Sequence, residues 1–458
     1  MILTSHPSEF GPQQSLRTAW IATSILVAFH ALSFMDRLIV TLLAVPIQKS
    51  FDLTDVQLGL LQGFAFAALF AIAGLPIGWL VDRYSRRFII LAGVLVWSVA
   101  TVSCGLARSF YGLCFARAGV GAGEATLSPA AFSLMADLFP RDRLASAIGV
   151  YFLGANIGAA LALTLGGLVI SVLTDWGGLT VPLIGHLEPW QATFLVIGAP
   201  GAVMAFLILL VREPPRRPVA PPEERSGVRA GGAEFLPFLL AKRKILACHF
   251  LGFPVLALVV YAIQAWAAVY MTRRFGWSPA LIGLIMGLAV GLCGGLANVI
   301  AGRIADRMVR RGILDAYFRL HVITTIIAVP VLLIAFSTAT PALFVVLFCI
   351  GKGLLTSFGG PSLATLQLIA PDRLRGRLSA LYLLVLAVVG TGLGPVATAL
   401  LTELVLGDRE MVGTSILIVV GVAAPFGATM LFLGMKHLRR EMSEAEADGR
   451  SGRVAHGQ

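Results

Sequence analysis

Charged residues are scarce in this sequence. Only 13% of its 458 residues are Asp, Glu, Lys or Arg, whereas 57% are hydrophobic. A water-facing surface needs a larger polar share, so a soluble globular domain is excluded and lipid is the expected surrounding. The five cysteines lie far apart, without the spacing of a metal-ligand or redox motif, and we interpret them as small packing residues.

Sequence patterns for chemical catalysis are missing as well. No glycine-rich phosphate-binding loop is present, which excludes the direct use of ATP. The seven histidines show no paired spacing on one helix face that would suit a metal ion. We therefore predict no catalytic residue, no metal and no cofactor, and we keep a membrane-embedded enzyme or a receptor as an alternative from another class.

Long apolar runs are abundant. They are continuous rather than alternating, so they indicate helices that cross a hydrocarbon core of about 30 Å and exclude the strands of a membrane barrel. We predict twelve spans, at Ala19–Ile47, Val56–Val81, Phe88–Ala107, Tyr111–Leu138, Ala145–Val172, Trp190–Val211, Ile245–Tyr270, Ala280–Ile304, Phe318–Phe336, Ala342–Ile369, Leu378–Leu404 and Val412–Met435.

Basic residues are distributed unevenly between the two sets of connecting loops. Of the 35 Lys and Arg residues, 27 fall on the side that carries both chain ends, five fall on the other side and three lie inside spans. The positive-inside rule then places both termini in the cytoplasm of an inner-membrane protein. The net charge of +11 reflects this topology, and we expect no nucleic-acid partner. No short apolar leader with a cleavage site precedes the first span, so we expect no removed segment.

The longest connection, between the sixth and seventh spans, is rich in Pro, Gly, Arg and Glu. It divides the chain into two halves of six spans. The predicted fold class is an all-α membrane protein with two pseudo-symmetric six-helix bundles, an architecture that places a substrate site between the bundles. The predicted ranges are a cytoplasmic N-terminal tail at 1–18, the N-terminal bundle at 19–211, a cytoplasmic linker at 212–244, the C-terminal bundle at 245–435 and a cytoplasmic tail at 436–458.

One sequence pattern occurs at the same place in both halves. It runs from Gly78 to Arg87 after the second span and from Gly302 to Arg311 after the eighth, with Gly, Asp-Arg and Arg-Arg at equal spacing. The pattern resembles the signature of the major facilitator superfamily. Small residues permit close helix contacts and acids can meet helix ends or arginines, so we predict a latch that holds one access state. The latch residues are Gly78, Asp82, Arg83, Arg86, Gly302, Asp306, Arg307 and Arg310.

Glycines also cluster inside several spans, where static packing explains most of them. The group Gly390, Gly394 and Pro395 in the eleventh span differs because a proline follows directly after a glycine. A Gly-Pro pair permits a bend, so we predict a hinge there.

Charged residues lie inside the first and fourth spans, where an ionised side chain costs at least about 2.5–3.5 kcal/mol and normally faces a partner or a cavity. Arg117 and Glu124 are seven residues apart and share one face of the fourth helix. We expect Asp36 to pair with Arg117 or Arg37 to pair with Glu124. Buried carboxylates exchange protons when their surroundings change, so these four residues are the predicted proton-coupling site, with a purely structural ion pair as the alternative.

Lys352 stands alone in the tenth span, and no acid lies near the middle of the neighbouring spans of its half. Since an unpaired buried ammonium is costly, we expect the substrate to be its partner, unless the side chain is neutral or reaches the membrane surface. The full set of predicted substrate-binding residues is Arg37, Arg117, Glu124, Lys352, Tyr261, Gln264, Trp266, Asn298 and His321.

The N-terminal half carries a further combination of segments: Phe34–Arg37, Gly78–Arg87, Arg117–Ala125, Ala136–Phe139 and Val211–Pro214. Together they resemble the spinster family, a branch of the superfamily. That family is associated with the movement of lysolipids and sphingosine phosphates, in some cases coupled to protons. The resemblance implies proton-coupled export of an amphipathic, lipid-like substrate by alternating access, with the mid-membrane charges in coupling or head-group binding. We expect a monomer whose partners are the substrate, protons and membrane lipids; transport of small organic anions such as sugar acids, or of drugs, is the alternative.

Overall fold

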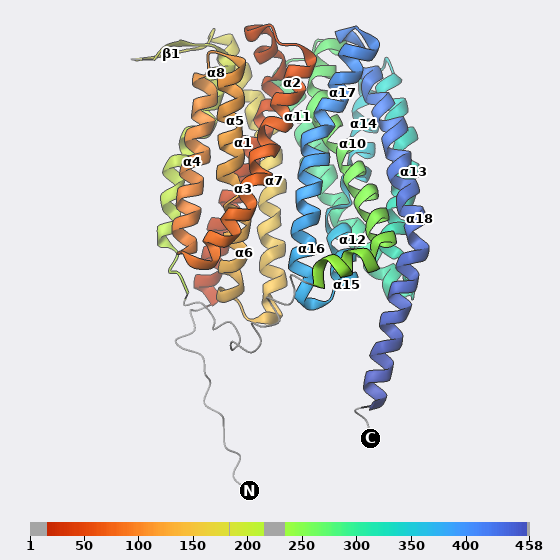
Figure 1. Cartoon of the computed structure of the whole chain (residues 1–458). Helices are drawn as coiled ribbons and strands as arrows, with labels where there is room; N and C mark the ends of the chain where they lie inside the picture. The colour runs from red at the N-terminus through yellow and green to blue at the C-terminus, as the bar shows by residue number, and fades with distance from the viewer. Residues whose placement is uncertain (1–15, 183, 215–233, 456–458) are drawn as a thin grey trace.

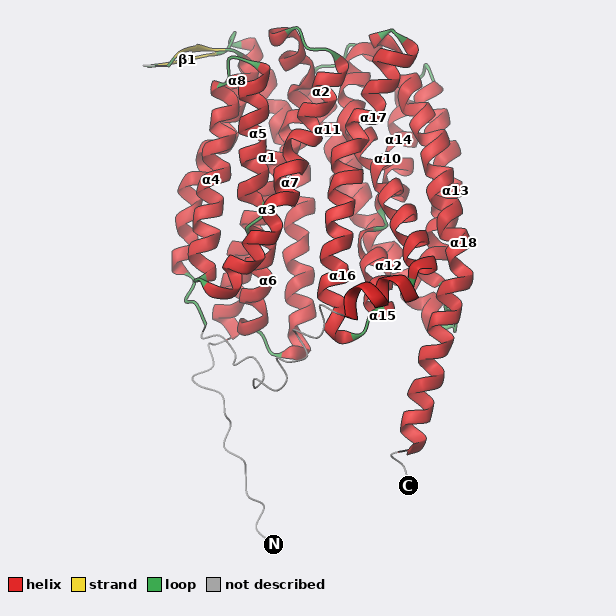
Figure 2. Ribbon diagram, viewed as in Figure 1, coloured by secondary structure: helices red, strands yellow, loops and turns green. Residues whose placement is uncertain are grey.

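The structure, a computed structural model, describes residues 16–182, 184–214 and 234–455. The rest of the predicted N-terminal tail and residues 215–233 of the predicted linker lie outside this part. Within it, helices predominate, and the strands are a short antiparallel pair, β1 (Leu179–Val181) and β2 (Gly185–Leu187) (Figure 2).

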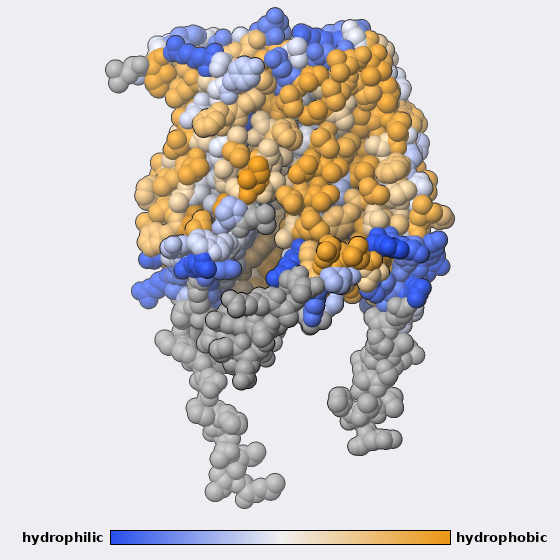
Figure 3. All heavy atoms as spheres, viewed as in Figure 1, coloured by the Kyte–Doolittle hydropathy of each residue, from blue (hydrophilic) through white to orange (hydrophobic). Residues whose placement is uncertain are grey.

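The helices run side by side along one axis (Figure 1). The start of α1 (Leu16–Phe51) and the end of α18 (Val412–Ala455) lie at one end, which we call the terminal end. The β1–β2 pair lies at the other, which we call the hairpin end. Side chains in the space-filling view form a broad apolar belt between two polar rims, as expected for a surface in contact with lipid (Figure 3).

The first half contains, after α1, the helices α2 (Asp55–Gln62), α3 (Phe64–Arg83), α4 (Arg86–Leu106), α5 (Phe110–Glu124), α6 (Leu127–Leu138), α7 (Arg141–Asp175), α8 (Pro189–Met204) and the 3₁₀ turn η1 (Ala205–Leu210). Capping residues mark the beginning of several of these helices. Thr54 and Gln57 form a reciprocal capping box before α2, and the Ser109 hydroxyl accepts a hydrogen bond from Gly112 N at the start of α5.

The second half begins after a helical stretch at 234–241. It contains α10 (Arg243–Phe275), α11 (Pro279–Gly287), η2 (Leu288–Gly294), α12 (Gly295–Arg310), α13 (Ala316–Ser337), α14 (Pro341–Thr356), α15 (Gly359–Ile369), α16 (Asp372–Val385), η3 (Leu386–Leu393), α17 (Gly394–Leu400), η4 (Leu401–Leu406), η5 (Arg409–Met411) and finally α18. The segments η2, η3 and η4 are π-helical, whereas η5 is a 3₁₀ turn.

Eleven helices of the described residues are long and apolar enough to cross a membrane. The predicted span Tyr111–Leu138 is formed by α5 and α6, which are separated at Ala125 and Thr126. The second predicted span is likewise divided at Gly63, where a side chain would meet the Gly392 carbonyl at 2.6 Å. The twelve-span architecture of the fold class is therefore present, with several spans broken where helices approach one another closely. Beyond the last predicted span, α18 continues to Ala455.

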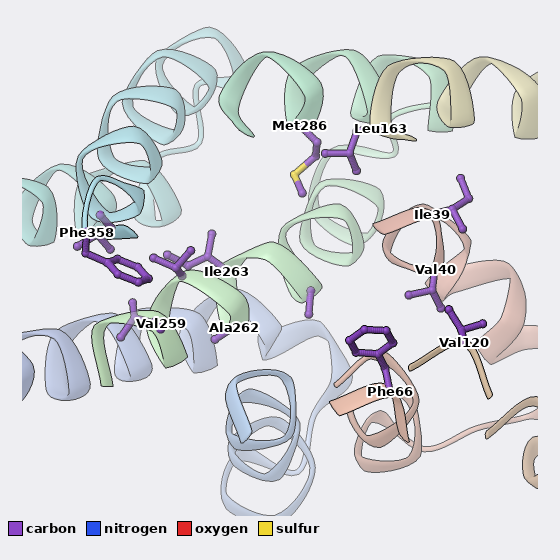
Figure 4. Packing of buried hydrophobic residues seen from close by; sticks show 14 of the residues in the cluster. Ile39, Val40, Phe66, Val120, Leu163, Val259, Ala262, Ile263, Met286 and Phe358 are labelled. Atoms are coloured by element: carbon purple, nitrogen blue, oxygen red, sulfur yellow. The ribbon is translucent and has the colours of Figure 1, made fainter. Parts of the chain in front are cut away.

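The two halves meet closely toward the hairpin end. A Cβ atom added to Gly59 of α2 would lie 2.9 Å from Ala399 of α17, and one added to Gly167 of α7 would lie 2.6 Å from the Pro279 carbonyl at the start of α11. Nearby, Leu163 of α7 points toward Met286 of α11 (Figure 4). Small residues thus let the backbones of the two halves touch on this side of the molecule.

Candidate functional site

The predicted mid-membrane charges of α1 and α5 come together in the structure. Arg37 donates two hydrogen bonds to Glu124 Oε2, from Nη2 at 2.5 Å and from Nε at 3.2 Å. Ser33, one helical turn before Arg37, donates a third to the same oxygen at 2.7 Å. The predicted pairing of Arg37 with Glu124 is confirmed.

Asp36 does not form the predicted side-chain pair with Arg117. Instead, Arg117 Nη1 donates to the main-chain carbonyl of Asp36 at 3.1 Å, and Nη2 lies 3.4 Å from the carbonyl of Arg37. The reason is geometric, because adjacent residues point about 100° apart around a helix and Arg117 reaches the backbone between them. Of the two alternative pairings, the structure therefore contains the one between Arg37 and Glu124.

The Asp36 carboxyl is consequently left without a hydrogen-bond donor among the described residues. The side chain is fully buried, and the Thr101 hydroxyl lies beside it without a hydrogen bond of ordinary geometry. Glu124 Oε1 and Arg117 Nε are also buried and unpaired within the described part of the chain. Such orphaned polar atoms are rare in folded proteins, and four of those in the described part of the chain belong to Asp36, Glu124 and Arg117.

Three phenyl rings surround the Arg37 guanidinium. Its central carbon lies 4.7 Å from the Phe34 ring, 4.5 Å from the Phe66 ring and 5.3 Å from the Phe70 ring. Arg37 is also the most accessible member of the cluster, with 16% of its side chain exposed, whereas the Glu124 side chain is fully buried. The arrangement offers a cation, a carboxylate and an aromatic surface at one place, which suits a ligand with both a charged and an apolar part.

The second half places its lone cation differently. Lys352 of α14 is 2% exposed, and its Nζ donates to the Val260 carbonyl of α10 at 2.7 Å. A backbone carbonyl of the neighbouring helix therefore supplies a partner that the sequence did not indicate, and the expected contact with a substrate stays a prediction. Trp266 Nε1 likewise donates a hydrogen bond to the Pro395 carbonyl at 2.8 Å.

The remaining substrate-binding candidates of this half divide into two groups. His321 and Asn298 each have a side-chain nitrogen close to a carbonyl of their own helix, 2.7 Å from Tyr317 O and 3.0 Å from Gly294 O respectively. Gln264 is buried with Nε2 lacking a partner in the described part of the chain, and Tyr261 is half-buried beside Gly390. Gln264 and Tyr261 therefore keep polar atoms that a ligand could engage, and their role stays a prediction.

The predicted latch is not engaged in this conformation. A side chain at Gly78 or Gly302 would meet nothing within 4 Å, and both Asp82 and Asp306 are exposed. Gly302 and Asp306 line an open pocket of about 270 Å³ at the terminal end of the second half. The expected close helix contact is absent at these two glycines because the helices are apart there, in contrast to the glycines near the hairpin end.

Arg86 is the exception among the latch residues. It is 1% exposed and forms ion pairs with Asp137 at the end of α6 and, at 3.1 Å, with Glu213 after η1. Burial alone would raise the pKa of Glu213, but hydrogen bonds from Ser85 and Arg86 outweigh it and hold that pKa below its ordinary value. The other arginines of the latch, Arg83, Arg307 and Arg310, are exposed, with Arg83 lying 4.0 Å above the Trp79 ring.

An ion pair that sequence reasoning missed joins the halves at the hairpin end. Arg273, in the last turn of α10, donates to both oxygens of Asp55, at 2.9 Å and 3.2 Å, and to the Gln48 side chain at 2.9 Å. Glu403 of η4 accepts from Val56 N at 2.8 Å, so it binds the N-terminal end of α2. The one available signal was that Arg273 is among the few basic residues predicted on that side of the membrane.

The predicted hinge lies where the helical hydrogen-bonding pattern changes. The π-helical η3 ends at Leu393, and α17 begins with Gly394 and Pro395. A side chain at Gly394 would lie 2.7 Å from the Leu258 carbonyl, so this glycine also allows close packing on α10. Its role as a hinge stays a prediction.

Comparisons with known proteins identify the family. Residues 25–395 match the family model described as Major Facilitator Superfamily. The chain belongs to the Major Facilitator Superfamily. It is accordingly a multi-pass membrane transporter of this family, related to spinster-family proteins.

Individual relatives differ in how much of the chain they share. An "MFS-type efflux pump" of Mycolicibacterium smegmatis is 27% identical over 445 residues, which are 96% of this chain and 97% of that protein. "Protein spinster homolog 1" of Homo sapiens is 27% identical over 264 residues, which are 55% of this chain and 46% of that protein. The spinster match thus covers about half of each chain.

Solved structures of this superfamily share the fold. A "Bacterial Homolog to Human Lysosomal Transporter, Spinster, in Inward-facing And Unoccupied Conformation" superposes with a TM-score of 0.77 at 25% identity, covering 94% of this chain and 98% of that chain. A D-xylose-proton symporter gives a TM-score of 0.67 at 16% identity, with 89% and 97% covered, and shows the fold alone.

Proposed function

We propose that this transporter exports an amphipathic, lipid-like substrate across the inner membrane by alternating access, driven by a proton gradient. The observation that carries the coupling is the Asp36 carboxyl, fully buried and without a donor among the described residues. An ionised carboxyl in such surroundings costs several kcal/mol, whereas the neutral acid is tolerated. Its proton occupancy therefore depends on whether the surroundings are open or closed.

Glu124 supplies the link between the proton and the substrate. While ionised, it holds Arg37 through the 2.5 Å ion pair. A proton on Glu124 removes that attraction and frees the guanidinium for an anionic head group such as a phosphate. The phenyl rings around Arg37 then contact the apolar part of the substrate next to its head group.

The two ends of the molecule support alternating access. Asp55 and Arg273 tie the halves at the hairpin end, while Gly78 and Gly302 at the terminal end face open space. With both termini in the cytoplasm, this conformation opens inward. The units 19–211 and 245–435 would then rock about the Arg37–Glu124 region, with the terminal-end latch closing as the hairpin-end ion pair opens. A monomer contains every residue that this cycle requires.

A second candidate is the export of drug-like amphipathic compounds. The efflux pump from Mycolicibacterium smegmatis favours it, since that protein is matched over 97% of its length and the human spinster homolog over 46%. Both candidates need an apolar surface beside a charge, and they differ in whether the ligand must carry an anionic head group.

The experiment is a flux assay with the full chain reconstituted in vesicles. Lysophosphatidic acid, sphingosine phosphate and a cationic drug are each offered with and without an imposed pH gradient. We expect gradient-stimulated flux of the anionic single-chain lipids. Gradient-driven flux of the drug alone would replace the first candidate with the second, and lipid flux indifferent to the gradient would refute proton coupling.

A further inference from the structure

An apolar groove of about 600 Å³ lies between α4 and α5 in the first half of the chain. Its floor is made of small residues, among them Ala100, Ser103, Gly112 and Ala116. Larger side chains stand along it and face outward, as shown by Phe115, which is 82% exposed. The groove therefore opens on the lipid-facing side of the protein rather than toward the other half.

The two faces of α5 are chemically distinct. Gly112, Ala116 and Gly119, spaced by four and three residues, line the groove. Arg117 and Glu124 occupy the opposite, buried face and belong to the charged cluster. The groove is thus separated from the charged cluster by the thickness of one helix, and it does not depend on the proposed transport function.

The dimensions of the groove correspond to one leaflet of a bilayer. Along α4 it runs from Leu95 to Ala107, which at 1.5 Å per residue is roughly 18 Å. This is a little more than half of a hydrocarbon core of about 30 Å. Toward the membrane centre α4 and α5 converge, since a Cβ on Gly119 would lie 3.2 Å from the Ala100 side chain. The groove is therefore a slot that starts at the hairpin end and narrows near mid-membrane.

A cation and an aromatic side chain stand at the mouth of this slot. Arg108 follows α4 directly, is exposed, and has no ion-pair partner within the described ranges. Tyr111, in the first turn of α5, is 80% exposed, which is typical of aromatic residues at the level of lipid head groups. An anionic group above the slot would meet Arg108 without competition from a protein carboxylate.

We propose that the α4–α5 groove binds one acyl chain of an anionic bilayer phospholipid, with Arg108 contacting its phosphate. An apolar slot of this size inside the membrane is filled by hydrocarbon, because water finds no polar partner there. The length of the slot and the unpaired cation at its mouth select a chain attached to an anionic head group in the hairpin-end leaflet. The site is a fixed lipid position on the scaffold of the first half.

Native mass spectrometry of the purified full chain, titrated separately with phosphatidylglycerol and phosphatidylcholine of equal chain length, tests the proposal. Ser103→Phe places a ring in the slot, and Val203→Phe, at a 75% exposed position on α8, is its matched control. Arg108→Gln removes the cation, and Lys49→Gln removes an exposed cation at the same end as its control. Melting temperatures establish that each variant is folded.

We expect wild type to retain one phosphatidylglycerol in preference to phosphatidylcholine, and Ser103→Phe to lose this retention while Val203→Phe keeps it. Arg108→Gln should lower the preference for phosphatidylglycerol about fivefold, with Lys49→Gln unchanged. Equal lipid retention by wild type and Ser103→Phe would overturn the proposal. So would stronger retention of single-chain lysophosphatidylglycerol than of the two-chain lipid, because the occupant would then resemble a transported substrate.

If Ser103→Phe fails to fold, wild-type protein alone decides the matter. Phosphatidylglycerol with a photoreactive diazirine near the end of one chain is incorporated and activated, and the labelled peptides are sequenced. Labelling of the peptide segments around Ala100 and Gly119 supports the proposal. Labelling that avoids residues 95–119 refutes it.

Discussion

The two copies of the repeated segment are alike in sequence and different in surroundings. Arg86 in the first half is 1% exposed and bound by Asp137 and Glu213, whereas its counterpart Arg310 in the second half is exposed. The charged residues at the centres of the two halves also have different surroundings. The first half brings two acids and two arginines together with several of their own polar atoms unpaired among the described residues, and the second half buries Lys352 against a backbone carbonyl.

This difference is the basis for proposing different roles for the two halves. The Val260 carbonyl does not titrate, so it remains an acceptor for the Lys352 side chain whether or not a proton moves. A carboxylate beside an arginine changes its interactions when it gains a proton. We propose that the first half is the proton-responsive half, and the substitutions below test the comparison between the halves, from the largest expected effect on stability to the smallest.

Arg117→Ala should be the most damaging substitution. It removes a buried cation that lies near the Asp36 and Glu124 carboxyls, removes the donors to two main-chain carbonyls and opens a void. Removal of one member of a buried charge cluster costs about 3–5 kcal/mol. Thermal unfolding in detergent measures it, with Arg310→Ala as the exposed control. Equal melting temperatures for Arg117→Ala and wild type would show that the cluster contributes nothing to the fold.

Arg86→Gln and Arg310→Gln form a matched pair at equivalent positions of the repeat. The first removes charged hydrogen bonds to Asp137 and Glu213 and should cost about 2–3 kcal/mol. The second changes an exposed side chain and should stay within about 0.5 kcal/mol of wild type. Denaturant unfolding of both variants measures the difference. Similar losses from both would mean that the surroundings of the two copies are equivalent.

Lys352→Met should have a small effect for a substitution at a buried charge. Methionine is unbranched like lysine, is one atom shorter and fills most of the same space, while the Val260 carbonyl keeps its place in the α10 helix. Stability should remain within about 1 kcal/mol, and gradient-driven flux should persist. Loss of flux at unchanged stability would instead assign Lys352 to the substrate, as the sequence alone suggested.

The positions of the spans could be predicted from sequence because a long apolar run in lipid can only be a helix. The pairing of Arg37 with Glu124 could be predicted because few buried charges are available to pair. The break at Gly63 could not, since it depends on the approach of the Gly392 carbonyl from the other half. The sequence identifies the charged side chains, but it does not show which backbone group of another helix will lie next to them.

The same limit applies to Lys352 and Arg117, both of which bind main-chain carbonyls of neighbouring helices. Every residue carries such a carbonyl, so sequence gives no means of choosing one. The Asp55–Arg273 ion pair was missed for a different reason. Its members are 218 residues apart, and each lies next to a loop where a charge is unremarkable.

The most direct test of proton coupling in the first half is the gradient-driven flux of Glu124→Gln in vesicles, recorded beside its melting temperature. Glutamine keeps an oxygen that can accept from Arg37 and Ser33, so the fold should be preserved, but it cannot carry a proton. We predict a melting temperature close to that of wild type and no stimulation of flux by the pH gradient. Wild-type stimulation in this variant would contradict the assignment of Glu124 as a proton carrier.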